Sequence, residues 1–159
     1  LSADCFDALL ADAQATKHAV VNGGEVCHPQ AGAGAQALEK QAAEALLAAL
    51  REAGESPAAL DEIFSSCKIE PALGRRAMAS LEKAGEAMRV TKELAFAAET
   101  LSQFEQAVRT CLANGASASA AELRDAMGTT RKYAIPLLEY FDGKGITRRS
   151  GDERVLTGR

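Results

Sequence analysis

The sequence lacks several features that mark other classes of protein. Tryptophan is absent, aromatic residues make up 4% of the 159 residues, and no apolar run approaches the length of a membrane-spanning helix. The N-terminus has neither the basic nor the apolar segment of a signal peptide. We therefore expect a cytoplasmic protein with no membrane contact. Its core should be helical and thin, because most of the 47% apolar residues are alanine and leucine.

Residues that could build an active site or a metal centre are also scarce. The two histidines, His18 and His28, have no serine or carboxylate at the spacing of a catalytic triad. The four cysteines form no CxxC pair, so we expect free thiols in a reducing compartment. A metal site built from Cys5, His18, Cys27 and His28 matches no zinc motif. No GxxxxGK[ST] phosphate loop occurs. The sequence thus predicts no catalytic residue, metal or cofactor.

The formal net charge of −4 hides an uneven distribution. From Gly128 to the C-terminus, basic residues outnumber acidic ones by seven to four, so the rest of the chain is the more acidic part. Basic residues gathered in one part of an acidic protein are typical of contact with a nucleic-acid backbone.

The same order of elements occurs twice along the chain. Residues 37–99 and 100–159 each contain patterns for a long helix, a short helix, a third helix and a β-hairpin. This order predicts two winged-helix domains, that is, a helix-turn-helix followed by a hairpin wing. The expected fold class is mostly α with small β-hairpins (α+β). Residues 1–30 match the last half of such a unit, with a turn at Asn22-Gly23, and residues 31–36 read as a flexible linker. The chain starts without methionine inside a helical pattern, so we expect a piece of a longer polypeptide.

Capping signals predict where several helices begin and end. Gly54 should end the helix that starts near Ala37, and Ser56-Pro57 should begin the next one. Thr100 is expected to cap the first helix of the last domain. Ser119-Ala-Ala-Glu122 is a capping-box pattern for its second helix.

The third helix of the last domain is predicted to expose basic and aromatic residues together. The 100° step per residue places one apolar arc inward. Pro136 removes one helical hydrogen bond and should kink the helix or loosen its first turn. The arc predicted to face inward comprises Ala134, Ile135, Leu137, Leu138 and Phe141, and the opposite, exposed face comprises Lys132, Tyr133, Pro136, Glu139 and Tyr140.

The hairpin that follows is predicted to be a basic wing. Ser150-Gly151-Asp152 should form its turn, and arginines flank this turn on both strands. Guanidinium groups on a short ribbon can grip phosphates. By comparison, Arg75 and Arg76 of the middle unit are better explained as a solvated helix face. The predicted RNA-binding residues are Arg131, Lys132, Tyr133, Lys144, Arg148, Arg149, Ser150, Gly151 and Arg154.

Residues Glu122 to Leu156 resemble the C-terminal end of the bacterial selenocysteine-specific elongation factor, SelB. The most specific part is Gly128-Thr-Thr-Arg-Lys-Tyr-Ala-Ile-Pro-Leu-Leu-Glu-Tyr-Phe-Asp-Gly-Lys-Gly-Ile-Thr-Arg-Arg149, whereas the first 120 residues resemble the family mainly in architecture. In that family four winged-helix domains follow the GTPase domains, which carry selenocysteinyl-tRNA, and the last one binds the SECIS hairpin of a selenoprotein mRNA. The resemblance implies that this chain covers the end of the second winged-helix domain, the third and the fourth. It also implies RNA binding without catalysis.

Two other functions remain open at the level of the sequence. A winged-helix regulator of duplex DNA is the main alternative, although such proteins usually place a longer basic helix in the major groove and pair as dimers. A protein-interaction scaffold, with the acidic middle domain binding a basic partner, is another. The favoured interpretation is a monomer whose partners are a SECIS mRNA hairpin and the ribosome.

Overall fold

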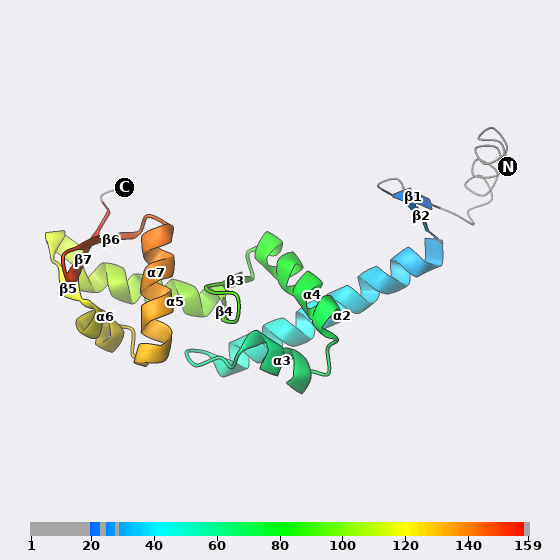
Figure 1. Ribbon diagram of the computed structural model, residues 1–159, viewed down its shortest axis with the longest axis horizontal. Helices are drawn as coiled ribbons and strands as arrows, with labels where there is room; N and C mark the ends of the chain where they lie inside the picture. Colours follow the sequence, from blue (N-terminus) through cyan, green and yellow to red (C-terminus); the bar gives the residue numbers. More distant parts are fainter. Residues whose placement is uncertain (1–19, 23–24, 28, 158–159) are drawn as a thin grey trace. The chain divides into compact units, whose positions relative to one another are not determined.

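The computed structural model describes residues 20–22, 25–27 and 29–157 (Figure 1). The chain divides into two compact units, Leu1–Gln41 and Ala42–Arg159. Over the described residues the fold is mostly helical with short antiparallel β-hairpins, which confirms the expected α+β class.

The first unit contains a β-hairpin and the start of a long helix. Strand β1 (Val20–Asn22) pairs antiparallel with β2 (Glu25–Cys27), which confirms the hairpin expected here. Helix α2 (Pro29–Ala53) then begins directly and continues into the second unit. The flexible linker predicted at residues 31–36 is therefore wrong, because the alanines of this segment favour a helix enough to offset its two glycines. The helix expected near residues 2–15 lies outside the described residues.

The second unit begins with the middle winged-helix domain. After α2 come helices α3 (Leu60–Ser66) and α4 (Pro71–Ala84), and then the antiparallel strands β3 (Ala87–Arg89) and β4 (Ala95–Ala97). We refer to residues 87–97 as the middle wing. The three helices enclose a small apolar core whose buried members include Leu46, Leu50, Ile63, Phe64, Met78 and Leu81.

Two of the predicted helix starts are wrong. Helix α3 begins at Leu60, not at Pro57, because the residues before it stay extended and the Leu60 N–H donates to the Glu93 carbonyl at 2.8 Å. Helix α5 (Ala98–Cys111) starts directly after β4 with Ala97 as its N-cap. Thr100, the expected cap, is instead a buried residue of the first turn. The start of α3 thus contacts the middle wing, and α5 starts where β4 of that wing ends.

The last winged-helix domain begins with α5. Its three strands, β5 (Ala118–Ser119), β6 (Thr147–Ser150) and β7 (Glu153–Leu156), form an antiparallel sheet in the order β5-β7-β6, and the predicted capping box at its second helix is present. The Ser119 N–H donates to Glu122 at 2.8 Å, which lowers the pKa of that carboxyl group, and the Ser119 hydroxyl lowers it further. The elements after α5 are the short 3-10 helix η1 (Ala113–Gly115), β5 (Ala118–Ser119), α6 (Ala120–Ala126), α7 (Arg131–Gly143), β6 (Thr147–Ser150) and β7 (Glu153–Leu156).

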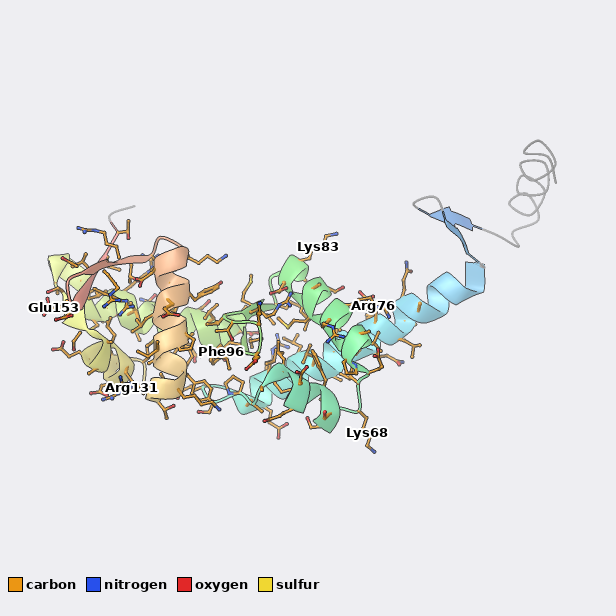
Figure 2. All side chains as sticks on the ribbon, in the orientation of Figure 1. Lys68, Arg76, Lys83, Phe96, Arg131 and Glu153 are labelled. Atoms are coloured by element: carbon orange, nitrogen blue, oxygen red, sulfur yellow. The ribbon has the colours of Figure 1, made fainter. Side chains whose placement is uncertain are left out.

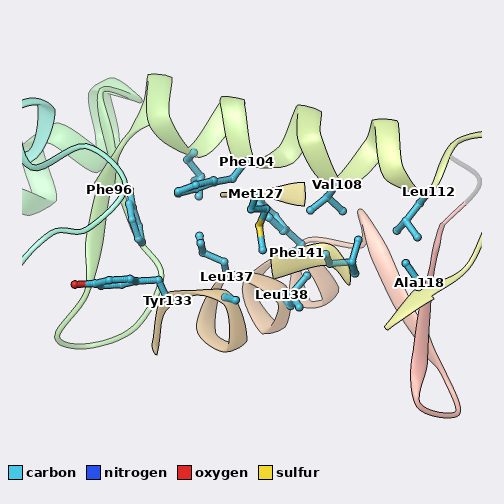
Figure 3. Close-up of a cluster of buried hydrophobic side chains, with 13 residues drawn as sticks. Phe96, Phe104, Val108, Leu112, Ala118, Met127, Tyr133, Leu137, Leu138 and Phe141 are labelled. Carbon is cyan, nitrogen blue, oxygen red and sulfur yellow. The ribbon is translucent and has the colours of Figure 1, made fainter. Parts of the chain in front are cut away.

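Helices α5 and α7 enclose the core of this last domain. Figure 3 shows side chains from α5, among them Phe104 and Val108, pointing toward Leu137 and Leu138 of α7. Helix α7 continues past Pro136, whose missing N–H leaves the carbonyl one turn earlier without its helical donor. This packing holds the helix that carries the predicted site.

We expect the middle domain to be sensitive to a single methyl group at Gly74. A Cβ at this position of α4 would lie 2.7 Å from the ring of Phe64, which is itself 2% exposed. Gly74→Ala should therefore lower the free energy of unfolding by about 1–2 kcal/mol, although alanine is the better helix former. Chemical denaturation measures the change.

Gly143 of α7 is the matched control, because it is a helical glycine with open space where a Cβ would be placed. Gly143→Ala should stabilise the chain by about 0.5–1 kcal/mol. Equal stabilisation by both substitutions would contradict the contact between α3 and α4.

Candidate nucleic-acid interface

The first turn of α7 presents two exposed basic side chains. Thr130, in an extended conformation, precedes the helix, and Arg131 and Lys132 follow it with no acidic residue in the turn. Figure 2 shows Arg131 at this end of the helix. Backbone N–H groups at a helix start carry partial positive charge, so this turn adds to the attraction of both side chains for a phosphate.

The wing formed by β6 and β7 exposes further basic residues. Arg148, Arg149 and Ser150 are all exposed, and the two arginines lie on opposite faces of the ribbon because successive strand residues alternate. Gly151 in the turn has a φ of 67°, a conformation that side chains with a Cβ rarely adopt. The wing therefore offers guanidinium groups on both of its faces.

A cleft of about 320 Å³ lies beside the first turn of α7. Small and apolar side chains form much of its lining, and Ile135, predicted to face inward, is 38% exposed there. Arg131 and Asp152 add polar groups that could bond to the edge of an unpaired base. The sequence prediction missed this cleft, although the adjacent alanines at the start of α6 are a signal for it. Its lining residues are Ser119, Ala120, Ala121, Arg124, Arg131, Ala134, Ile135 and Asp152.

Tyr133 does not lie on the exposed face, contrary to the prediction. Its residue exposure is 8%, its ring meets Phe96 edge-on at 6.2 Å, and its hydroxyl donates to the Pro57 carbonyl at 3.1 Å. The helical periodicity of α7 could not show this, because the covering residues come from the middle domain. In this structure the Tyr133 ring is not accessible for stacking on a base.

Arg154 is also buried, with 7% of its surface exposed. Its Nε donates to Asp142 near the end of α7 at 3.0 Å, and the buried Thr147 hydroxyl donates to the other oxygen of that carboxylate at 2.5 Å. Arg154 also lies directly opposite Arg149 in the hairpin, where two like charges would repel each other. Asp142 offsets this repulsion, so Arg154 joins the wing to α7 and does not face solvent.

Lys144 lies at the far end of α7 from Arg131. It is exposed, and its Nζ lies 5.4 Å from the centroid of the Tyr140 ring. A helix of this length spans roughly 20 Å, so the structure does not bring Lys144 close to the first turn. The candidate interface thus consists of the first turn of α7, the cleft and the wing, with Lys144 as an outlying basic residue.

The described part of the chain shows neither a metal site nor a membrane-spanning helix. No group of three His, Cys, Asp or Glu residues there could hold a metal ion. None of its helices is long and apolar enough to span a membrane. Cys67 and Cys111 are free thiols, as expected. His18 and His28, considered for a metal site, lie outside the described residues.

We expect Arg154 to matter for folding more than the exposed arginines do. Arg154→Ala leaves the Asp142 carboxylate half-buried without its ion-pair partner, which should lower the free energy of unfolding by about 2–4 kcal/mol. Arg148→Ala, on the same ribbon but exposed, should change it by less than about 0.5 kcal/mol. Urea denaturation of the two variants tests this, and equal stabilities would refute a structural role for Arg154.

The last domain matches a known family. Residues 110–156 match the model described as elongation factor SelB, winged helix. Three selenocysteine-specific elongation factors are similar in sequence. That of Haemophilus influenzae is 27% identical over 95 residues, which cover 60% of this chain and 15% of the relative. That of Escherichia coli is 36% identical over 67 residues (42% and 11%), and that of Desulfomicrobium baculatum is 33% identical over 79 residues (50% and 12%). The matches span only a small part of these relatives.

Two solved structures are similar as well. The mRNA-binding domain of elongation factor SelB from E. coli, solved in complex with SECIS RNA, has a TM-score of 0.64 and 27% identity. That match covers 77% of this chain and 96% of the other. A bacterial selenocysteine-specific elongation factor, EF-Sec, has a TM-score of 0.59 at 23% identity, with 93% of this chain and 23% of the other covered. The second match shows the fold alone. Residues 110–156 thus form a winged-helix domain of the SelB family, and the chain resembles the C-terminal winged-helix part of that elongation factor.

Proposed function

We propose that this chain is the RNA-binding part of a selenocysteine-specific elongation factor, and that its last winged-helix domain holds the SECIS hairpin of a selenoprotein mRNA. The observation that carries the proposal is the set of exposed basic residues in the first turn of α7, beside a cleft, and on the wing, within a domain of the SelB family. The similarity to an E. coli domain solved with SECIS RNA supports it.

The geometry suggests a division of labour among the interface residues. Arg131, Lys132 and the start of α7 would hold one stretch of RNA backbone. The positive side chains and the positive end of the helix dipole both attract phosphates there. The arginines of the wing, with Ser150 and Gly151 at its tip, would hold a second stretch. The cleft between them would take an unpaired base, since RNA hairpins are read through their splayed loops and bulges. Lys144 would add a phosphate contact farther along.

The proposal extends to the organisation and setting of the chain. Residues 37–99 and 100–159 would be two winged-helix domains, and residues 1–30 the end of a preceding one. The chain would act in the cytoplasm, as a monomer and without catalysis of its own, with the ribosome as a second partner. Duplex DNA is the weaker candidate, because the matches are to elongation factors and α7 exposes basic residues mainly at its first turn.

A titration of the full chain with a SECIS hairpin tests the proposal. Arg148→Ala/Arg149→Ala should weaken binding at least tenfold. It should also reduce the slope of log affinity against log salt by about 1.5, the equivalent of roughly two phosphate contacts. Electrophoretic titration at several salt concentrations gives both numbers.

Arg75→Ala/Lys83→Ala removes the same charge from exposed positions of α4 in the middle domain and is the matched control. It should change affinity less than about threefold. An equal loss in this control would reject the site, and equal binding to a hairpin with a scrambled loop would reject recognition of SECIS.

A further inference from the structure

The two winged-helix domains of the second unit share a joint built from the middle wing. Strand β4 ends at Ala97 and α5 begins at Ala98, so no linker separates the domains. Phe96 of β4 is completely buried and belongs to the core of the last domain. Its ring meets Phe104 of α5 edge-on at 5.6 Å and Tyr133 of α7 at 6.2 Å. The chain thus passes from one domain to the other through a packed aromatic cluster (Figure 3).

Polar and apolar contacts surround this cluster. Half-buried Met88, Val90 and Leu94 of the middle wing pack against the core of the last domain. The Tyr133 hydroxyl points away from that core in Figure 3 and donates to the buried carbonyl of Pro57. The apolar residues of the middle wing are therefore covered by the neighbouring domain, while Arg89 and residues 91–93 stay exposed.

The joint lies directly beneath one part of the proposed RNA interface. Tyr133 follows Arg131 and Lys132 in the first turn of α7, and Lys132 lines a cleft of about 190 Å³ with Pro57 and Leu94 of the middle domain. A rotation between the domains about an axis away from this contact would separate the Tyr133 hydroxyl from the Pro57 carbonyl. The orientation of the first turn of α7 therefore depends on the middle domain as well as on the core of the last domain.

We propose that Tyr133 is a positioning residue for RNA binding: its hydroxyl locks the start of α7 onto Pro57, so that the two winged-helix domains form one rigid body that holds the first turn of α7 in place for RNA. The inference rests on the proposed function. A first turn of α7 that is already fixed in place spares the conformational entropy that a loosely held turn would lose on binding. Loss of the hydroxyl would also leave the buried Pro57 carbonyl without its donor.

Tyr133→Phe tests the lock, because it removes the hydrogen bond and keeps the buried ring. Affinity for a SECIS hairpin should fall about two- to tenfold, the range expected for one hydrogen bond. The salt dependence of binding should stay unchanged, because no phosphate contact is lost. Lys132→Ala should instead lower the salt slope by nearly one contact. Tyr140→Phe, on the same helix and away from the joint, is the control and should leave affinity unchanged.

Residual dipolar couplings of the labelled full chain, measured without RNA, give an independent readout. One alignment tensor should fit residues 42–97 and 98–157 together in the unmodified chain, and Tyr133→Phe should require two. A single tensor in the variant, or two tensors in the unmodified chain, would overturn the lock. Two tensors in the variant with unchanged affinity would overturn the positioning role. The unmodified chain could also show one tensor and yet not bind SECIS RNA. That result would reject the proposed function, and with it the positioning role of Tyr133, but it would leave the rigid joint between the domains in place.

Discussion

The interaction on which the proposed interface depends is the contact between Asp142 and the wing. One carboxylate near the end of α7 accepts hydrogen bonds from Thr147 and Arg154, one on each strand of the hairpin. It fixes the ribbon to the helix and offsets the charge of the arginine opposite Arg149. Burying two charges away from water costs free energy, so such an ion pair adds little net stability. Loss of one partner is more destabilising, because the other charge is then left without its partner. The main effect of the ion pair is therefore to specify one position of the wing. The position of the wing in turn determines where its exposed arginines lie.

A second constraint acts at the other end of α7. There the middle wing covers Tyr133, and the first turn that carries Arg131 and Lys132 lies against a neighbouring domain. The helix is thus held at its start by an aromatic joint and near its end by an ion pair. Both ends carry basic side chains just beside the buried contact, which connects the packing of the domain directly to the geometry of the proposed RNA interface.

The sequence predictions succeeded where the interacting residues are close in the sequence and failed where they are far apart in it. The capping box at Ser119 and the turn at Gly151 depend on neighbours within a few residues, and both are confirmed. The predicted exposure of Tyr133 and Arg154 is wrong, because their partners lie 76 and 12 residues away in the sequence. Periodicity shows which face of an isolated helix is apolar, but it cannot show that a second domain covers another face. The exposure of Arg131, Lys132, Arg148 and Arg149 was predictable, because charged side chains are exposed by default.

The central claim is that RNA binds across the first turn of α7 and the wing of the last domain. Amide chemical shifts of the labelled full chain, followed during titration with a SECIS hairpin, test it most directly. We expect the largest changes at residues 131–132 and 148–151, with smaller ones along the cleft beside Ile135 and little change along α4. The largest changes on α4 of the middle domain, with residues 148–151 unaffected, would contradict it.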